Sequence, residues 1–147
     1  MKTRLPKKQK GAAAIEFALV FVIFFAVLYG VVSYSLPLLL MQSFNNATSE
    51  AVRRSMAVDP TAANYGSAVQ TLAVSVLNDK LSWVPSAVRG SIVPTATYNA
   101  TTKVLTASVT LPSTALSAIM PVLKLGIITV PDLPSDLVAQ SSAQLVP

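Results

Sequence analysis

The feature that most constrains this chain is a long apolar stretch near its N-terminal end. Of the 30 residues 12–41, 25 are apolar, and no charged residue occurs between Glu16 and Glu50. An α-helix rises about 1.5 Å per residue and crosses the hydrocarbon core of a bilayer in about 20 residues. We therefore expect residues 12–41 to form a transmembrane helix.

The net positive charge of the chain comes from its first ten residues. The formal net charge is +5, and acidic and basic residues balance over the rest of the chain. Lysine and arginine are retained on the cytoplasmic side of a membrane, so Lys7, Lys8 and Lys10 predict a cytoplasmic N terminus and an exported C-terminal part. A nucleic-acid-binding protein needs a basic face on its folded part. We expect membrane lipid, and no nucleic acid, among the partners.

The composition excludes several common classes of catalytic site. The chain has no histidine and no cysteine, which excludes histidine-based triads, cysteine nucleophiles and zinc sites with nitrogen or sulfur ligands. Its five glycines are too far apart along the sequence for a phosphate-binding loop. We therefore expect no enzyme activity, no catalytic residue, no cofactor and no metal site.

Glu16 is the one acidic residue inside the apolar stretch. A carboxylate in the middle of a bilayer costs about 2.5–3.5 kcal/mol on insertion scales, which suggests that it has a partner. A shallow position near the headgroups, favoured by the positive end of the helix dipole, is the simpler explanation. Glu16 lies five residues after Gly11, a lone glycine at the boundary between the basic and apolar segments. This spacing favours a specific role for Glu16.

Residues 7–17, with the sequence KKQKGAAAIEF, resemble the leader of type IV pilin-like proteins. The run from Gly11 onward is most similar to the TadE-type pseudopilins of tight-adherence (Tad/Flp) pilus systems. Residues 42–54, QSFNNATSEAVRR, resemble the stretch that follows the membrane segment in that family. The residue after the glycine is Ala12, unlike the phenylalanine common in major type IV pilins.

The resemblance implies that a prepilin peptidase cuts between Gly11 and Ala12 and that Glu16 and Phe17 take part in leader recognition and assembly. Glu16 of one subunit then neutralises the terminal amine of a neighbour. The implied partners are the peptidase, other pilin or pseudopilin subunits, the assembly platform and the inner bacterial membrane. We therefore predict a basic leader over residues 1–11 and a minor pilin or pseudopilin that contributes to pilus biogenesis and adhesion.

Three other interpretations remain open. A secretory signal peptide would be cut near residues 33–35, although the apolar stretch exceeds the usual ~7–15 residues of such a signal. An uncleaved single-pass anchor with an adhesive or binding outer domain explains the length and the orientation without using Glu16. A pseudopilin of a type II secretion system would have the same N-terminal features.

Residues 42–147 are expected to form a small exported domain, which makes the fold class α+β. The long helix is predicted to kink at Pro37 and to continue to about Val58. Apolar residues then recur at helical spacing from Tyr65 to Leu77, which predicts an amphipathic helix.

The second half of this domain is expected to contain antiparallel strands. Threonine and serine alternate with apolar residues over 91–111, which predicts a β-hairpin with a turn at 99–103 and one hydroxyl-bearing face. A short helix over 113–123 and a last strand over 137–146 complete the prediction. Trp83 is expected to anchor the core.

Overall fold

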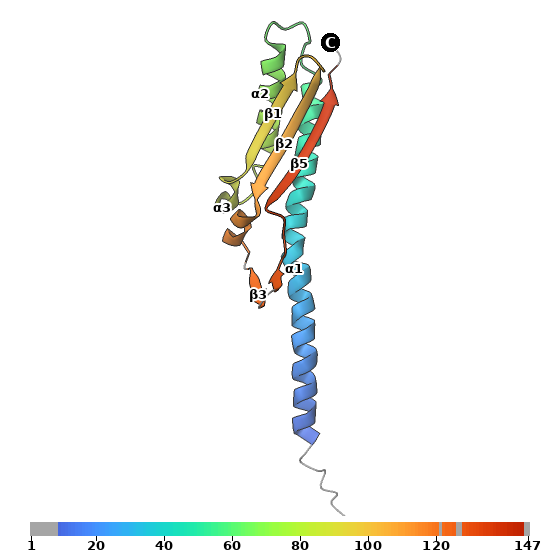
Figure 1. The fold of residues 1–147 in the computed structure, drawn as a ribbon, viewed down its shortest axis with the longest axis vertical. Coiled ribbons are helices and arrows are strands. Elements are labelled where there is room, and N and C mark those ends of the chain that lie inside the picture. Colours follow the sequence, from blue (N-terminus) through green and yellow to red (C-terminus); the bar gives the residue numbers. More distant parts are fainter. Residues whose placement is uncertain (1–8, 121, 126–127, 146–147) are drawn as a thin grey trace, which may run out of the picture.

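The computed structural model describes residues 9–120, 122–125 and 128–145. A long helix leads into a small domain of antiparallel strands and shorter helices (Figure 1), which confirms the predicted α+β class. The elements are α1 (Gln9–Ser55), α2 (Tyr65–Lys80), α3 (Ser86–Arg89), β1 (Val93–Asn99), β2 (Val104–Pro112), the 3₁₀ helix η1 (Ser113–Ala118), β3 (Leu123–Leu125), β4 (Ile128–Val130) and β5 (Asp136–Gln144).

Helix α1 passes through two different surroundings. Residues 11–28 are exposed on every side, whereas from Ser33 onward one side of the helix becomes buried. The helix continues through the predicted kink site at Pro37 and ends at Ser55, slightly before Val58. Its second half buries side chains three and four residues apart, which lie on one side of a helix: Leu40, Phe44, Ala47 and Ala51.

The three-stranded sheet has the order β1-β2-β5, with both pairs antiparallel. Side chains of β2 alternate between buried and half-buried, so the predicted hairpin with one apolar and one hydroxyl-bearing face is confirmed. Asn99 shapes its turn, because the Asn99 Oδ1 atom accepts hydrogen bonds from the backbone N–H groups of Thr101 (2.9 Å) and Thr102 (3.1 Å).

The core lies between the sheet and two helices. The second half of α1 packs against β5 and β2, and α2 packs against β1 and α1 (Figure 1). The buried positions of α2, Val69, Ala73, Val76 and Leu77, confirm the predicted amphipathic helix. The opposite face of the sheet is left uncovered by helices in Figure 1.

The prediction for Trp83 was wrong. Its side chain is 49% exposed, and its indole Nε1–H donates a hydrogen bond to Ser43 Oγ on α1 at 3.1 Å. The loop after α2 instead buries the neighbouring Leu81 and Val84. These smaller side chains fill the core at this level, and the indole ring lies on the surface of α1.

The predictions for the chain after β2 were only partly right. The expected helix over 113–123 is the shorter η1, and Leu123 belongs to a two-stranded antiparallel hairpin formed by β3 and β4. A proline at 121, which lies outside the described residues, cannot donate the amide hydrogen that a continuing helix needs. The last strand is present as β5, and Val146 lies outside the described residues.

Two phenylalanines of α1 differ in burial, which predicts how strongly their replacement by alanine lowers the stability of the domain. Phe44 is completely buried, whereas Phe21 is 48% exposed in the apolar half. We expect Phe44→Ala to lower the free energy of unfolding of the domain by about 3–5 kcal/mol, because it leaves a cavity in the core. Phe21→Ala is the matched control and should leave domain stability unchanged. Equal losses in chemical unfolding of the two full-length variants in detergent would contradict this packing.

Candidate functional site

The residues predicted to direct cleavage and assembly lie at the start of α1. Lys7 and Lys8 are outside the described residues, and for Lys10 the structure gives only its helical backbone. Gly11, Ala12, Glu16 and Phe17 all lie in the first turns of the helix and are exposed to solvent.

The bond between Gly11 and Ala12 is open to an approaching protein. A Cβ atom added at Gly11 would meet nothing within 4 Å. Glycine lowers helix stability by about 1 kcal/mol relative to alanine. The scissile bond implied by the resemblance therefore lies at a residue that weakens the helix locally.

Glu16 has no hydrogen bond or ion pair within the described part of the chain. It follows Ala12 by four residues, so the two lie on the same side of α1 and about 6 Å apart along its axis. A chain that begins at Ala12 would carry its terminal amine on the side of the helix that bears Glu16. The charge of this carboxylate is thus available to a partner outside the described residues.

Phe17 belongs to an exposed aromatic ridge. Its ring centroid lies 5.9 Å from that of Phe21, which lies 5.3 Å from that of Phe25. Phe17 is the one member of this ridge that was predicted from the sequence, although the four-residue spacing of Phe17, Phe21 and Phe25 indicates the whole ridge. Because a helix turns about 100° per residue, Glu16 and the ridge occupy different sides of α1.

A second cluster of charges lies near the other end of α1. Arg53 Nε donates to Glu50 Oε2 at 2.7 Å, and Arg54 Nε donates to Glu50 Oε1 at 2.7 Å. These hydrogen bonds lower the pKa of Glu50 to about 2, and the bond from Arg53 has the larger effect. The arginine side chains remain 73% and 48% exposed, and both are paired with Glu50.

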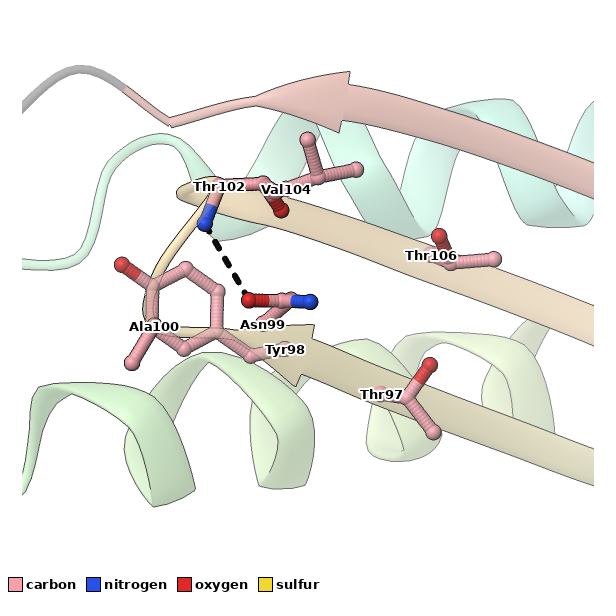
Figure 2. Close-up of a pocket in the computed structure, with 7 residues that line it drawn as sticks. All are labelled: Thr97, Tyr98, Asn99, Ala100, Thr102, Val104 and Thr106. Carbon is pink, nitrogen blue, oxygen red and sulfur yellow. Dashed lines mark hydrogen bonds between the residues drawn. The ribbon is translucent and has the colours of Figure 1, made fainter.

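The domain has a shallow hollow beside the turn between β1 and β2. Figure 2 shows the lining side chains, which include Thr97, Tyr98, Asn99 and Thr106. Tyr98 is the one lining residue with an ionisable side chain. Within residues 9–120, 122–125 and 128–145, no group of three or more His, Cys, Asp or Glu side chains could hold a metal ion. The hollow thus offers no arrangement of catalytic groups.

The apolar first half of α1, with Glu16, and the pair Glu50 and Arg53 lie in one continuous segment that matches a known family. Residues 11–53 match the model of the TadE-like protein family. This match confirms the resemblance predicted from the sequence. No curated protein and no solved structure matched the chain.

The TadE-like segment, residues 11–53, begins at Gly11 and ends within α1. It supports a function related to Tad pili and an association with pilus subunits in general. In the described part of the chain, α1 is the one helix long and apolar enough to cross a membrane. This length and composition are compatible with a single-pass membrane anchor.

The Glu50 cluster predicts how stability depends on pH. The pKa of Glu50 in the folded protein, about 2, lies below the ordinary value of 4.5, so its ionised form stabilises the fold. This contribution is complete above about pH 4.5 and is lost as the pH falls toward 2. We expect Glu50→Gln to lower the unfolding temperature by a few degrees at most at pH 7, and to have a much smaller effect at pH 2.

Thermal unfolding of the full-length protein in detergent, followed by circular dichroism, measures this difference. Asp79→Asn is the control, because Asp79 is exposed on α2 and forms no ion pair within the described residues. A Glu50→Gln effect of the same size at pH 7 and pH 2 would show that the ionised carboxylate does not stabilise the fold.

Proposed function

We propose that this chain is a membrane-anchored minor pilin or pseudopilin of a tight-adherence (Tad/Flp) pilus system. The observation that carries the proposal is Glu16, a carboxylate without a partner in the described residues that lies in an exposed apolar helix just after Gly11. Both residues fall within the TadE-like segment. In this proposal the chain is a structural subunit and a substrate of a prepilin peptidase, with no catalytic activity of its own.

The dimensions of α1 support an anchor in the inner membrane of a bacterium. Residues 11–28, which no other part of the described chain covers, span about 27 Å at 1.5 Å per residue. This length is close to the ~30 Å thickness of a bilayer core. The basic residues Lys7, Lys8 and Lys10 hold the N terminus in the cytoplasm, and the domain after residue 41 lies outside it.

Cleavage after Gly11 changes the electrostatics of the anchor. It removes the basic residues and creates an amine on Ala12. Burying that amine or the Glu16 carboxylate alone is costly in a medium of low dielectric constant, whereas pairing them recovers much of the cost. Pairing between neighbouring subunits would set their axial register, and the exported domain would contact other subunits, the assembly platform or an adhesive target.

The processing step predicts the N terminus of the mature protein. Protein purified from its native membrane should begin at Ala12 and lack the mass of the eleven leader residues. We expect Gly11→Ala to abolish this cleavage, because it adds a methyl group directly beside the bond that the peptidase is proposed to cut. The substitution should not disturb the fold, since a Cβ atom at Gly11 meets nothing within 4 Å.

Gly30→Ala is the matched control for cleavage, because a Cβ atom at Gly30 also meets nothing within 4 Å. N-terminal sequencing and intact mass of both variants give the readout. A wild-type protein that starts at Met1 would overturn the processing step and favour an uncleaved anchor with an adhesive outer domain. A start near Leu36 would indicate a secreted domain.

The assembly role of Glu16 predicts a separate defect. We expect the cleaved molecules of Glu16→Gln to assemble into pili at least tenfold less than cleaved wild-type molecules, because the amide cannot neutralise the amine of a neighbour. Ala18→Gln is the control, since it places the same amide in the apolar helix and leaves Glu16 in place. Counting pili by electron microscopy, with cleavage checked by mass, separates the two steps. Normal piliation of Glu16→Gln would disprove the assembly role.

A further inference from the structure

The hairpin formed by β3 and β4 lies at the end of the domain nearest the apolar half of α1 (Figure 1). It belongs to an unusually uncharged part of the sequence, because Lys124 is the one charged residue in the whole segment 113–131. The described residues around β3 remain accessible, with Val122 41% and Leu123 40% exposed.

Contacts with α1 fix the height of this hairpin along the helix. Directly after β4, the backbone N–H of Asp132 donates a hydrogen bond to the Tyr34 hydroxyl at 2.9 Å. Leu133 and Pro134 then line an apolar groove together with Pro37 and Leu38 of α1. The hairpin is therefore tied to α1 near residue 34.

The level of Tyr34 corresponds to the surface of a bilayer. A core that begins at Ala12 and takes about 20 helical residues ends near residue 31. Tyr34 then lies about 4.5 Å beyond the core, at 1.5 Å per residue. The headgroup layer on each side of a bilayer is about 5–8 Å thick, so the chain next to Tyr34 lies within it.

We propose that the described start of the β3–β4 hairpin, formed by Val122, Leu123 and Lys124, docks into the headgroup layer of the outer leaflet and holds the sheet domain at a fixed height above the membrane. This inference rests on the membrane span in the proposed function. Val122 and Leu123 remove apolar surface from water on docking. Lys124, exposed beside them, can place its ammonium among lipid phosphates while its alkyl chain lies against apolar groups.

A lipid surface fits these observations better than a neighbouring subunit does. The lipid must reach the level of Tyr34 whenever α1 spans the bilayer, and the single cation complements the phosphate groups of the lipids. Residues 11–28 of α1, which the proposed span places in the bilayer, are also exposed. A second copy of the chain at this place is an alternative that the experiment distinguishes.

The absence of cysteine in the sequence permits labelling at single sites of the full-length protein. Leu123→Cys places an environment-sensitive fluorophore on the hairpin, and Ser142→Cys is the matched exposed site on β5. The hydroxyl of the neighbouring Ser141 lies 3.0 Å from the hydroxyl of Thr48. Thr48 lies about 21 Å from Tyr34 along the axis of α1, so this site is well above the level of the hairpin. Val22→Cys reports on the middle of the span. Each labelled protein is reconstituted in phosphatidylcholine–phosphatidylglycerol vesicles containing nitroxide lipids.

We expect headgroup nitroxides to quench the probe at residue 123 at least threefold more than the probe at residue 142. Nitroxides deep in the acyl chains should quench the probe at residue 22 most strongly. Equal quenching at 123 and 142, with strong quenching at 22, would overturn the hairpin proposal alone. Weak quenching at 22 would overturn the membrane span and with it the proposed function.

A concentration series separates lipid contact from contact between copies. Quenching at residue 123 that stays constant as the protein is diluted in lipid supports docking to the membrane. Fluorescence at 123 that changes with the protein-to-lipid ratio, without quenching by headgroup nitroxides, would show that a second copy occupies this surface. Val122→Cys replaces Leu123→Cys if circular dichroism shows that the latter does not fold.

Discussion

The packing of the second half of α1 against the sheet is the interaction on which the rest of the structure depends. Phe44, Ala47 and Ala51 are completely buried on one side of this helix, and the Thr48 hydroxyl lies 3.0 Å from the Ser141 hydroxyl of β5. Because one continuous helix forms both part of the domain core and the apolar segment, the position of the domain is coupled directly to that of residues 11–28. No flexible linker separates the two within α1.

The two acidic residues of α1 differ in their partners. Glu50 is neutralised within its own chain by Arg53 and Arg54, whereas Glu16 finds no partner in the described residues. In the proposed function the missing partner is the amine of a neighbouring subunit. The helix would then transmit the register set at Glu16 to the exported domain, and the β3–β4 hairpin would restrain that domain at the membrane surface.

The regular elements could be predicted because each depends on a local repeat. Helical spacing from Tyr65 to Leu77 and alternation along β2 determine which side of each element is apolar, whatever it packs against. Trp83 and the β3–β4 hairpin could not be predicted in this way. An aromatic residue in a loop is buried or exposed according to the space its neighbours leave, and here Leu81 and Val84 fill the core. The β3–β4 pairing joins short strands that carry too few residues to show a repeat.

The sequence by itself determined the long apolar helix, the basic N-terminal segment and the placement of Gly11, Ala12, Glu16 and Phe17 at its start. These features follow from residue type and spacing along a single helix, which requires no distant contact. Only the tertiary structure decided where the apolar helix becomes part of the core and which of its residues stay uncovered. Tertiary structure also brought Asp132, which follows the hairpin, beside Tyr34, because contacts between residues far apart in sequence depend on how the sheet and α1 pack together.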